Sequence, residues 1–154
     1  MKKISLILAF VLLLTFTMGV SAFASPYSLT GNETSTSDSL VYIKKPASHS
    51  ATTSERTYTV SAVGKPGVDV TIYRKSAYDG NFYRVFQKGY ILESTIGASG
   101  VYVVSIELLE GGNKMIVYAE NNSERQIIKI DITRLSKTQL DRIKSLSIGD
   151  LFSY

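Results

Sequence analysis

The chain has 154 residues, with 17 lysines and arginines against 13 aspartates and glutamates, one histidine and no cysteine. This weakly basic balance, without a dense run of cations, excludes a typical nucleic-acid binder, so no nucleic-acid partner is expected. Because disulfides are impossible, the fold must be held together by its hydrophobic core.

Residues 1–24 predict a signal peptide. Two lysines precede an almost wholly apolar run at 4–16, and alanines occupy the −3 and −1 positions before the Ala24–Ser25 bond. An uncleaved membrane anchor is the alternative, but the run is shorter than the roughly 20 residues that a spanning helix needs. We therefore expect cleavage after Ala24, a secreted mature chain and no membrane span after cleavage.

Residues 25–38 are rich in serine and threonine and have few apolar anchors, which predicts a flexible N-terminal arm. Between 39 and 134, short segments rich in β-branched and aromatic residues are separated by turn signals about every eight to twelve residues. No helical pattern separates these segments, so parallel βαβ units are disfavoured. We predict an all-β fold: an antiparallel two-sheet sandwich of about seven strands, followed by a short helix.

Two of these segments, 56–63 and 68–73, alternate clearly on either side of the turn Gly64–Gly67. A strand places alternate side chains on opposite faces, so each segment has one inward and one outward set. The inward set predicted for the second strand is Val68, Val70 and Ile72, and the outward set is Asp69, Thr71 and Tyr73.

The segment 101–122 contains two apolar runs on either side of Glu110–Asn113. Glycine permits the positive φ of a tight turn, and Asn113 can hydrogen-bond to nearby backbone. The glycines lack the following Lys-Ser/Thr of a phosphate-binding loop. We predict a hairpin between two core strands, with its interior built from Val104, Ile106, Leu108, Ile116 and Tyr118.

Residues 135–154 predict a helical tail. Ser136 and Gln139 have the spacing of a capping box, and Gly149 can end the helix. Two interpretations remain open: the helix caps one end of the sandwich, or it binds a partner or a second copy. The residues that would bind a partner are Leu140, Ile143, Leu146, Phe152 and Tyr154.

The segment 73–90 combines aromatic and cationic side chains, which suit stacking on sugar rings, acidic polymers or a protein partner. The alternative is a hairpin turning at Asp79–Gly80 whose aromatic residues cover the core. Phe82 and Phe86 are expected to point inward. The candidate ligand-binding residues are Tyr73, Arg74, Tyr78, Tyr83 and Arg84, with the three tyrosines exposed.

No catalytic machinery is evident. His49 lies between Ser48 and Ser50 in a polar loop, but adjacency in sequence does not place a base on a nucleophile, and no orienting acid is indicated. A single histidine without cysteine is a poor zinc site, and no calcium-loop pattern occurs. We therefore predict no enzymatic activity, no metal site and no cofactor.

Three segments resemble bacterial Ig-like domains. Gly64–Tyr73 is similar to their "G-x-x-x-P-G-x-x-V-x-V" turn and strand, Gly100–Leu108 to their "G-x-F/Y-x-x-x-V-x-L" strand, and Leu109–Ala119 to their "L-x-x-G-x-N-x-I-x-V-x-A" hairpin. The Asp-containing segment that often follows is replaced by Ala119–Ser123, so the resemblance does not extend to a cation site.

The resemblance covers residues 40–133 and implies an Ig-like sandwich over 39–134. Such domains serve as spacers, adhesive modules and accessory modules of surface enzymes, and a shared fold does not fix one function. It implies a secreted, non-catalytic binding or scaffolding domain at the cell surface or in the medium, with a protein or a cell-envelope glycan as partner. The alternative is a carbohydrate-recognition accessory module that uses residues 73–90.

Overall fold

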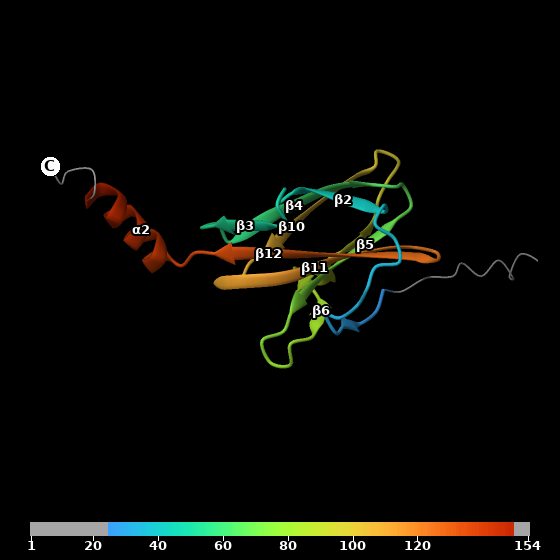
Figure 1. Cartoon of the computed structure of the whole chain (residues 1–154), viewed down its shortest axis with the longest axis horizontal. Helices are drawn as coiled ribbons and strands as arrows, with labels where there is room; N and C mark the ends of the chain where they lie inside the picture. Colours follow the sequence, from blue (N-terminus) through green and yellow to red (C-terminus); the bar gives the residue numbers. More distant parts are fainter. Residues whose placement is uncertain (1–24, 150–154) are drawn as a thin grey trace, which may run out of the picture.

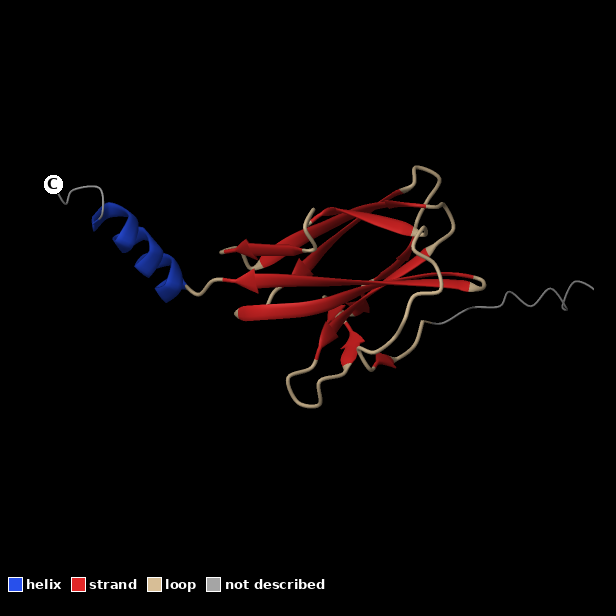
Figure 2. Ribbon diagram, in the orientation of Figure 1, coloured by secondary structure: helices blue, strands red, loops and turns tan. Residues whose placement is uncertain are grey.

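Strands make up most of residues 25–149, the part of the chain that the computed structural model describes (Figure 1, Figure 2). The larger sheet has the spatial order β1 (Ser28–Leu29), β6 (Phe82–Arg84), β5 (Asp69–Lys75), β11 (Gly111–Asn121), β12 (Glu124–Arg134) and β3 (Ser50–Thr53), and β9 (Glu93–Thr95) also pairs with β5. The smaller sheet has the order β10 (Val101–Glu107), β4 (Thr57–Gly64) and β2 (Val41–Lys45). Two short strands, β7 (Phe86–Gln87) and β8 (Tyr90–Ile91), form a separate hairpin, and helix α2 (Lys137–Gly149) follows β12.

The strand pairs are antiparallel except for β3, which runs parallel to β12. The chain therefore passes from the smaller sheet to the larger one between β2 and β3, in the segment that contains Pro46. The predicted all-β fold with a short C-terminal helix is confirmed.

One apolar cluster joins the two sheets. Val60 and Ile106 come from the smaller sheet, Ile72 and Val117 come from the larger one, and all four are fully buried. Each strand supplies alternate residues because successive side chains point to opposite faces. The inward positions predicted for the segment 68–73 are confirmed, since Val68, Val70 and Ile72 belong to this cluster, as do Val60 and Ala62 of β4.

A second apolar cluster lies on the opposite face of the larger sheet, so β5 and β11 are buried on both faces. Tyr73, which was expected to be exposed, is 0% exposed, and Thr71 beside it is 1% exposed. Ile116 and Tyr118 are also buried in this second region rather than between the sheets, which corrects the predicted interior. The cluster consists of Leu29, Tyr73, Phe82, Ile116 and Tyr118.

The cover of this second cluster is the N-terminal segment, residues 25–37, which was expected to be a flexible arm. Leu29 is 3% exposed, and β1 pairs with β6. Further along, the Thr36 N–H donates to the Arg125 carbonyl at 2.8 Å, and the Ile127 N–H donates to the Ser35 hydroxyl at 2.9 Å. Serines and threonines of this segment thus hydrogen-bond to backbone groups on the part of the β12 edge that β3 does not pair with. The prediction of a flexible arm is therefore wrong.

The connection between β10 and β11 is not a hairpin, because these strands belong to different sheets. Gly111 has φ of 84°, a conformation that glycine adopts at no steric cost. Asn113 is 2% exposed and closes the crossover: its Oδ1 accepts from the Leu109 N–H at 2.9 Å. Its Nδ2 donates to the carbonyls of Leu109, Gly111 and Ile132 at 2.9, 3.0 and 3.2 Å. The predicted roles of glycine in a positive-φ turn and of Asn113 in bonding nearby backbone are therefore confirmed. The prediction of a hairpin is wrong, because the segment connects two sheets.

Helix α2 begins at the predicted capping box. The Ser136 N–H donates to the Gln139 Oε1 at 2.9 Å, and the Gln139 N–H donates to the Ser136 hydroxyl at 3.2 Å. The helix projects away from the sheets (Figure 1), and Ile143 is 53% exposed. The helix therefore does not cover an end of the sandwich. No helix among residues 25–149 is long and apolar enough to span a membrane.

Some predictions fall outside the described residues. These are the signal peptide at 1–24 and the tail residues Phe152 and Tyr154; for Leu146, the backbone is described but the side chain is not.

Deleting residues 136–154 is expected to change the free energy of unfolding by less than about 0.5 kcal/mol, because the described side chains of α2 do not pack on the core. Urea unfolding of chains that begin at Ser25, with and without residues 136–154, measures this. Ser136→Ala in the full chain is the matched control: it removes the cap and should lower the helical circular dichroism signal without moving the urea midpoint. A large loss of stability on deletion would restore the capping interpretation.

Candidate functional site

The five predicted ligand-binding residues do not share one surface. Across the β5–β6 pair, Tyr73 lies opposite Arg84 and Arg74 lies opposite Tyr83. Because neighbours along a strand point to opposite faces, these two pairs are on opposite faces of the sheet. Tyr78 is in the connection between the two strands.

The pair formed by Tyr73 and Arg84 holds the N-terminal segment. The Tyr73 hydroxyl and the Arg84 Nε both donate to the Pro26 carbonyl, at 2.5 and 3.0 Å. Arg84 Nη1 also lies 3.9 Å from Glu93 Oε2. Burial raises the pKa of the Tyr73 hydroxyl, and the bond with Arg84 opposes this. These two residues are structural and are not available to a ligand.

On the other face, Arg74 and Tyr83 line a hollow of about 290 Å³, which Arg84 also borders and Tyr78 does not. The Arg74 guanidinium donates to the Glu107 carbonyl, while its Nε is buried and has no hydrogen-bond partner. Burial lowers the pKa of Arg74. Tyr83 lies beside Arg74, and Phe86 and Leu109, which are 68% and 61% exposed, border the same hollow. The hollow therefore combines a cation with exposed apolar side chains.

Phe86 was expected to point inward, and its exposure corrects that prediction. Phe82 is buried as expected, but the alternation shifts after β6 ends at Arg84. Val85 donates its N–H to the Ile72 carbonyl at 2.8 Å and takes the inward position. Gln87 then bonds to the β10 backbone, which leaves Phe86 pointing outward.

We call three tyrosines the tyrosine patch: Tyr83, which borders the hollow, Tyr27, which contacts Tyr83, and Tyr78, which projects from the β5–β6 connection. Tyr78 is 99% exposed and Tyr27 is 78% exposed. The rings of Tyr27 and Tyr83 meet edge to face, with centroids 5.9 Å apart. Sequence reasoning missed Tyr27, because no local pattern links it to Tyr83. The β1–β6 pairing places Ser28 opposite Tyr83, and this brings the neighbouring Tyr27 close to the Tyr83 ring.

Asp79 adds a fixed negative charge to the tyrosine patch. The Tyr83 hydroxyl donates to its carboxylate, and this bond lowers the pKa of Asp79 to about 2. The same bond raises the pKa of Tyr83. At neutral pH Asp79 is therefore an ionised hydrogen-bond acceptor beside the rings. The turn at Asp79–Gly80 was predicted, and Gly80 has φ of 77°.

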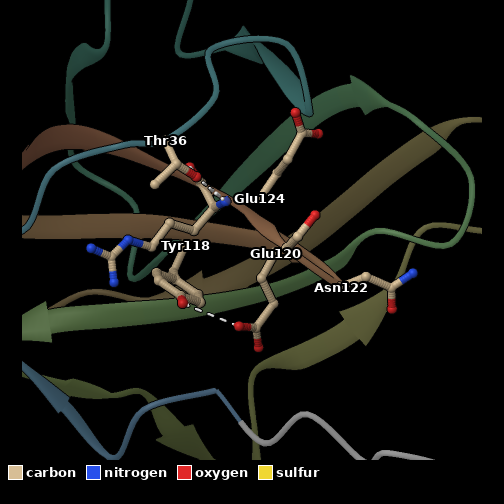
Figure 3. Close-up of a pocket in the computed structure, with 7 residues that line it drawn as sticks. Thr36, Tyr118, Glu120, Asn122 and Glu124 are labelled. Carbon is tan, nitrogen blue, oxygen red and sulfur yellow. Dashed lines mark hydrogen bonds between the residues drawn. The ribbon is translucent and has the colours of Figure 1, made fainter.

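A second hollow, of about 230 Å³, lies around Glu120 at the end of β11 (Figure 3). Tyr118 and Glu120 point toward one another, and the Tyr118 hydroxyl donates to Glu120 Oε2 at 3.1 Å. Glu120 Oε1 is buried and has no hydrogen-bond partner. Burial raises the pKa of Glu120; burial, together with Glu120 itself, raises that of Tyr118 to about 12. No local motif marks this pair, which depends on the N-terminal segment covering β11.

Within residues 25–149, no group of three or more His, Cys, Asp or Glu side chains is arranged to hold a metal ion. His49 has φ of 58° and is exposed, and its backbone bonds to Pro46 and Asp131. No protein-family model matches the chain, and no curated protein matches it in sequence.

Proposed function

We propose that this protein is a secreted, non-catalytic Ig-like domain that binds a partner at the bacterial cell surface or in the medium. The strand order supports the Ig-like assignment. Strands β2, β4 and β10 form one sheet, and the long strands β5, β11 and β12 are neighbours in the other. This division matches that of strands A, B and E against C, F and G in Ig domains.

One observation carries the binding role: the tyrosine patch beside a hollow that contains a cation. Tyr78, Tyr27 and Phe86 keep most of their surface in water, although aromatic side chains stabilise proteins mainly when buried. Arg74 borders the adjoining hollow, and its Nε is buried without a hydrogen-bond partner. An unpaired buried donor is costly, so a ligand acceptor that reached this N–H after a shift of the Arg74 side chain would stabilise the complex.

The ligand class that this surface fits best is a glycan. Sugar rings stack on exposed tyrosines, and their hydroxyls donate to a fixed carboxylate such as Asp79, while Arg74 can donate to a sugar oxygen. A protein partner is the second candidate, because exposed tyrosine and arginine are the residues enriched at protein interfaces.

Replacing Tyr78 and Tyr83 together with alanine is expected to weaken binding to purified cell-envelope glycan at least about tenfold, the effect of losing roughly 1.4 kcal/mol of contact. The matched control replaces Tyr42 and Tyr90, each 55% exposed, on β2 and β8. Sedimentation with insoluble glycan measures the bound fraction, and circular dichroism checks folding. Equal binding by the two double variants would reject the tyrosine patch as the contact surface. If the chain does not sediment with the glycan but captures a protein from the cell envelope, the ligand class is protein.

A further inference from the structure

Ser25, the first residue after the expected cleavage point, is buried. It is 2% exposed, and its hydroxyl lies 2.7 Å from the hydroxyl of Thr71 in a shared hydrogen bond. The end of a domain is normally exposed and loosely held. This end instead fits onto β5 in the middle of the larger sheet, so its chemistry matters to the fold.

The strand register surrounds Thr71 with carboxylates. Glu93 lies opposite Thr71 across the β5–β9 pair, and Asp69 lies opposite Glu120 across the β5–β11 pair. Asp69 and Thr71 are two residues apart on β5, so they share a face. Directly opposed residues on one face are about 5 Å apart, so Glu93 lies next to Thr71 and Glu120 next to Asp69, on the face of β5 that the Ser25 hydroxyl contacts.

Each of the three carboxylates has at least one partner. Glu93 lies 3.9 Å from Arg84 Nη1, and Asp69 accepts from the Thr95 hydroxyl. Glu120 accepts from the Tyr118 hydroxyl through Oε2, but its Oε1 is buried without a partner. Among the described residues, no lysine or arginine forms an ion pair with Glu120.

We propose that signal-peptide cleavage creates the missing partner: the α-ammonium group of Ser25 binds the Glu120 carboxylate and so stabilises the mature fold. The inference rests on the export and cleavage proposed above, but not on the identity of any ligand. Hydrolysis adds water across the Ala24–Ser25 peptide bond: the C–N bond breaks, the water oxygen stays on Ala24 as part of a carboxylate, and the Ser25 nitrogen takes up both protons of the water. A neutral amide with one N–H becomes a cation with three donors.

The local charges agree with this assignment. Burial raises the pKa of Glu120, Asp69 and Glu93 raise it further, and the Tyr118 and Ser25 hydroxyls oppose the rise. A cation beside Glu120 would lower the pKa of its carboxyl group. The titratable and charged groups around this site, each of which influences the pKa of Glu120, Tyr73 or Tyr118 or is one of these three, are Asp69, Tyr73, Arg84, Glu93, Tyr118, Glu120 and Arg125.

The pH dependence follows from the sign of the shift. An α-amino group has a pKa of about 7.7 to 8.0 when unperturbed, and neighbouring carboxylates raise it in the folded chain. The added stability is therefore fully present below about pH 7.7 and is lost as the pH rises through the higher folded-state value.

The test compares two mature chains: one begins with a free Ser25, released from a fusion by a protease that leaves no extra residue, and the other carries an Nα-acetyl group. Acetylation is expected to raise the unfolding equilibrium constant about tenfold at pH 7 in urea titrations. This gap between the unfolding constants of the two chains should close at high pH. With Glu120→Gln in both chains, the gap should fall below about twofold. Equal stability of the two wild-type chains, or an unchanged gap with Glu120→Gln, would overturn the proposal.

Two further measurements keep the test decisive if Glu120→Gln does not fold. NMR titration of the free wild-type chain should give an α-amino pKa above the ordinary range of about 7.7 to 8.0, and a value within or below that range overturns the proposal. The intact mass of the exported protein should correspond to a start at Ser25, and any other start rejects the cleavage step. Neither measurement involves a glycan, so failure here leaves the binding proposal standing.

Discussion

Replacing Asn113 with alanine is expected to lower the free energy of unfolding by about 3 kcal/mol. Its buried amide makes four hydrogen bonds to backbone groups, three of them to the crossover and one to Ile132 on β12. Removing one partner leaves each buried group unsatisfied, at about 1 to 3 kcal/mol per group before relaxation and water entry. Asn113→Asp should be no better, because a carboxylate cannot donate to the three carbonyls.

Urea unfolding measures the effect, and Lys114→Ala is the matched control, since Lys114 is the next residue on β11 and is exposed. The control should change the free energy of unfolding by less than about 0.5 kcal/mol. If Asn113→Ala behaves like the control, the crossover does not depend on this amide.

Much of the fold was predictable because it depends on local rules. Alternation identified Val68, Val70 and Ile72 as inward, and the glycines at 67, 80, 100 and 111 occur where φ is positive. The capping box of α2 is also a short-range device, since Ser136 and Gln139 need only their own backbone. Such features are encoded within a few residues of one another.

The errors arose where a distant segment decides the outcome. Alternation shows which residues of β11 share a face, but not which face meets the other sheet. Ile116 and Tyr118 were therefore correctly grouped and wrongly placed, because the N-terminal segment buries their face. Tyr73 and Arg84 were predicted to contact a ligand, but their side chains donate to the Pro26 carbonyl of this covering segment. Tyr27 and Glu120 were missed for the same reason, since neither belongs to a local motif.

Replacing Leu29 with alanine is expected to lower the free energy of unfolding by about 3 kcal/mol, which is typical when a buried leucine is truncated. Leu29 is 3% exposed and packs on the second apolar cluster, which includes Tyr73 and Ile116. A flexible arm would give no effect. Thr30→Ala is the matched control, because Thr30 is exposed and its hydroxyl makes only a 3.4 Å bond to Glu33. Urea unfolding of both variants measures the difference.

Deleting residues 25–37 should have a larger effect than Leu29→Ala. The deletion uncovers an apolar face on β5 and β11 and frees the edge of β12 that Ser35 and Thr36 now occupy. An uncovered apolar sheet face and an open strand edge both favour association. The shortened chain is therefore expected to unfold at lower urea and to self-associate in light scattering, whereas Leu29→Ala should keep the mass of the unchanged chain. A shortened chain as stable and monodisperse as the chain that begins at Ser25 would show that the apolar cluster between the two sheets alone sustains the fold, and that the N-terminal segment is a passive cover.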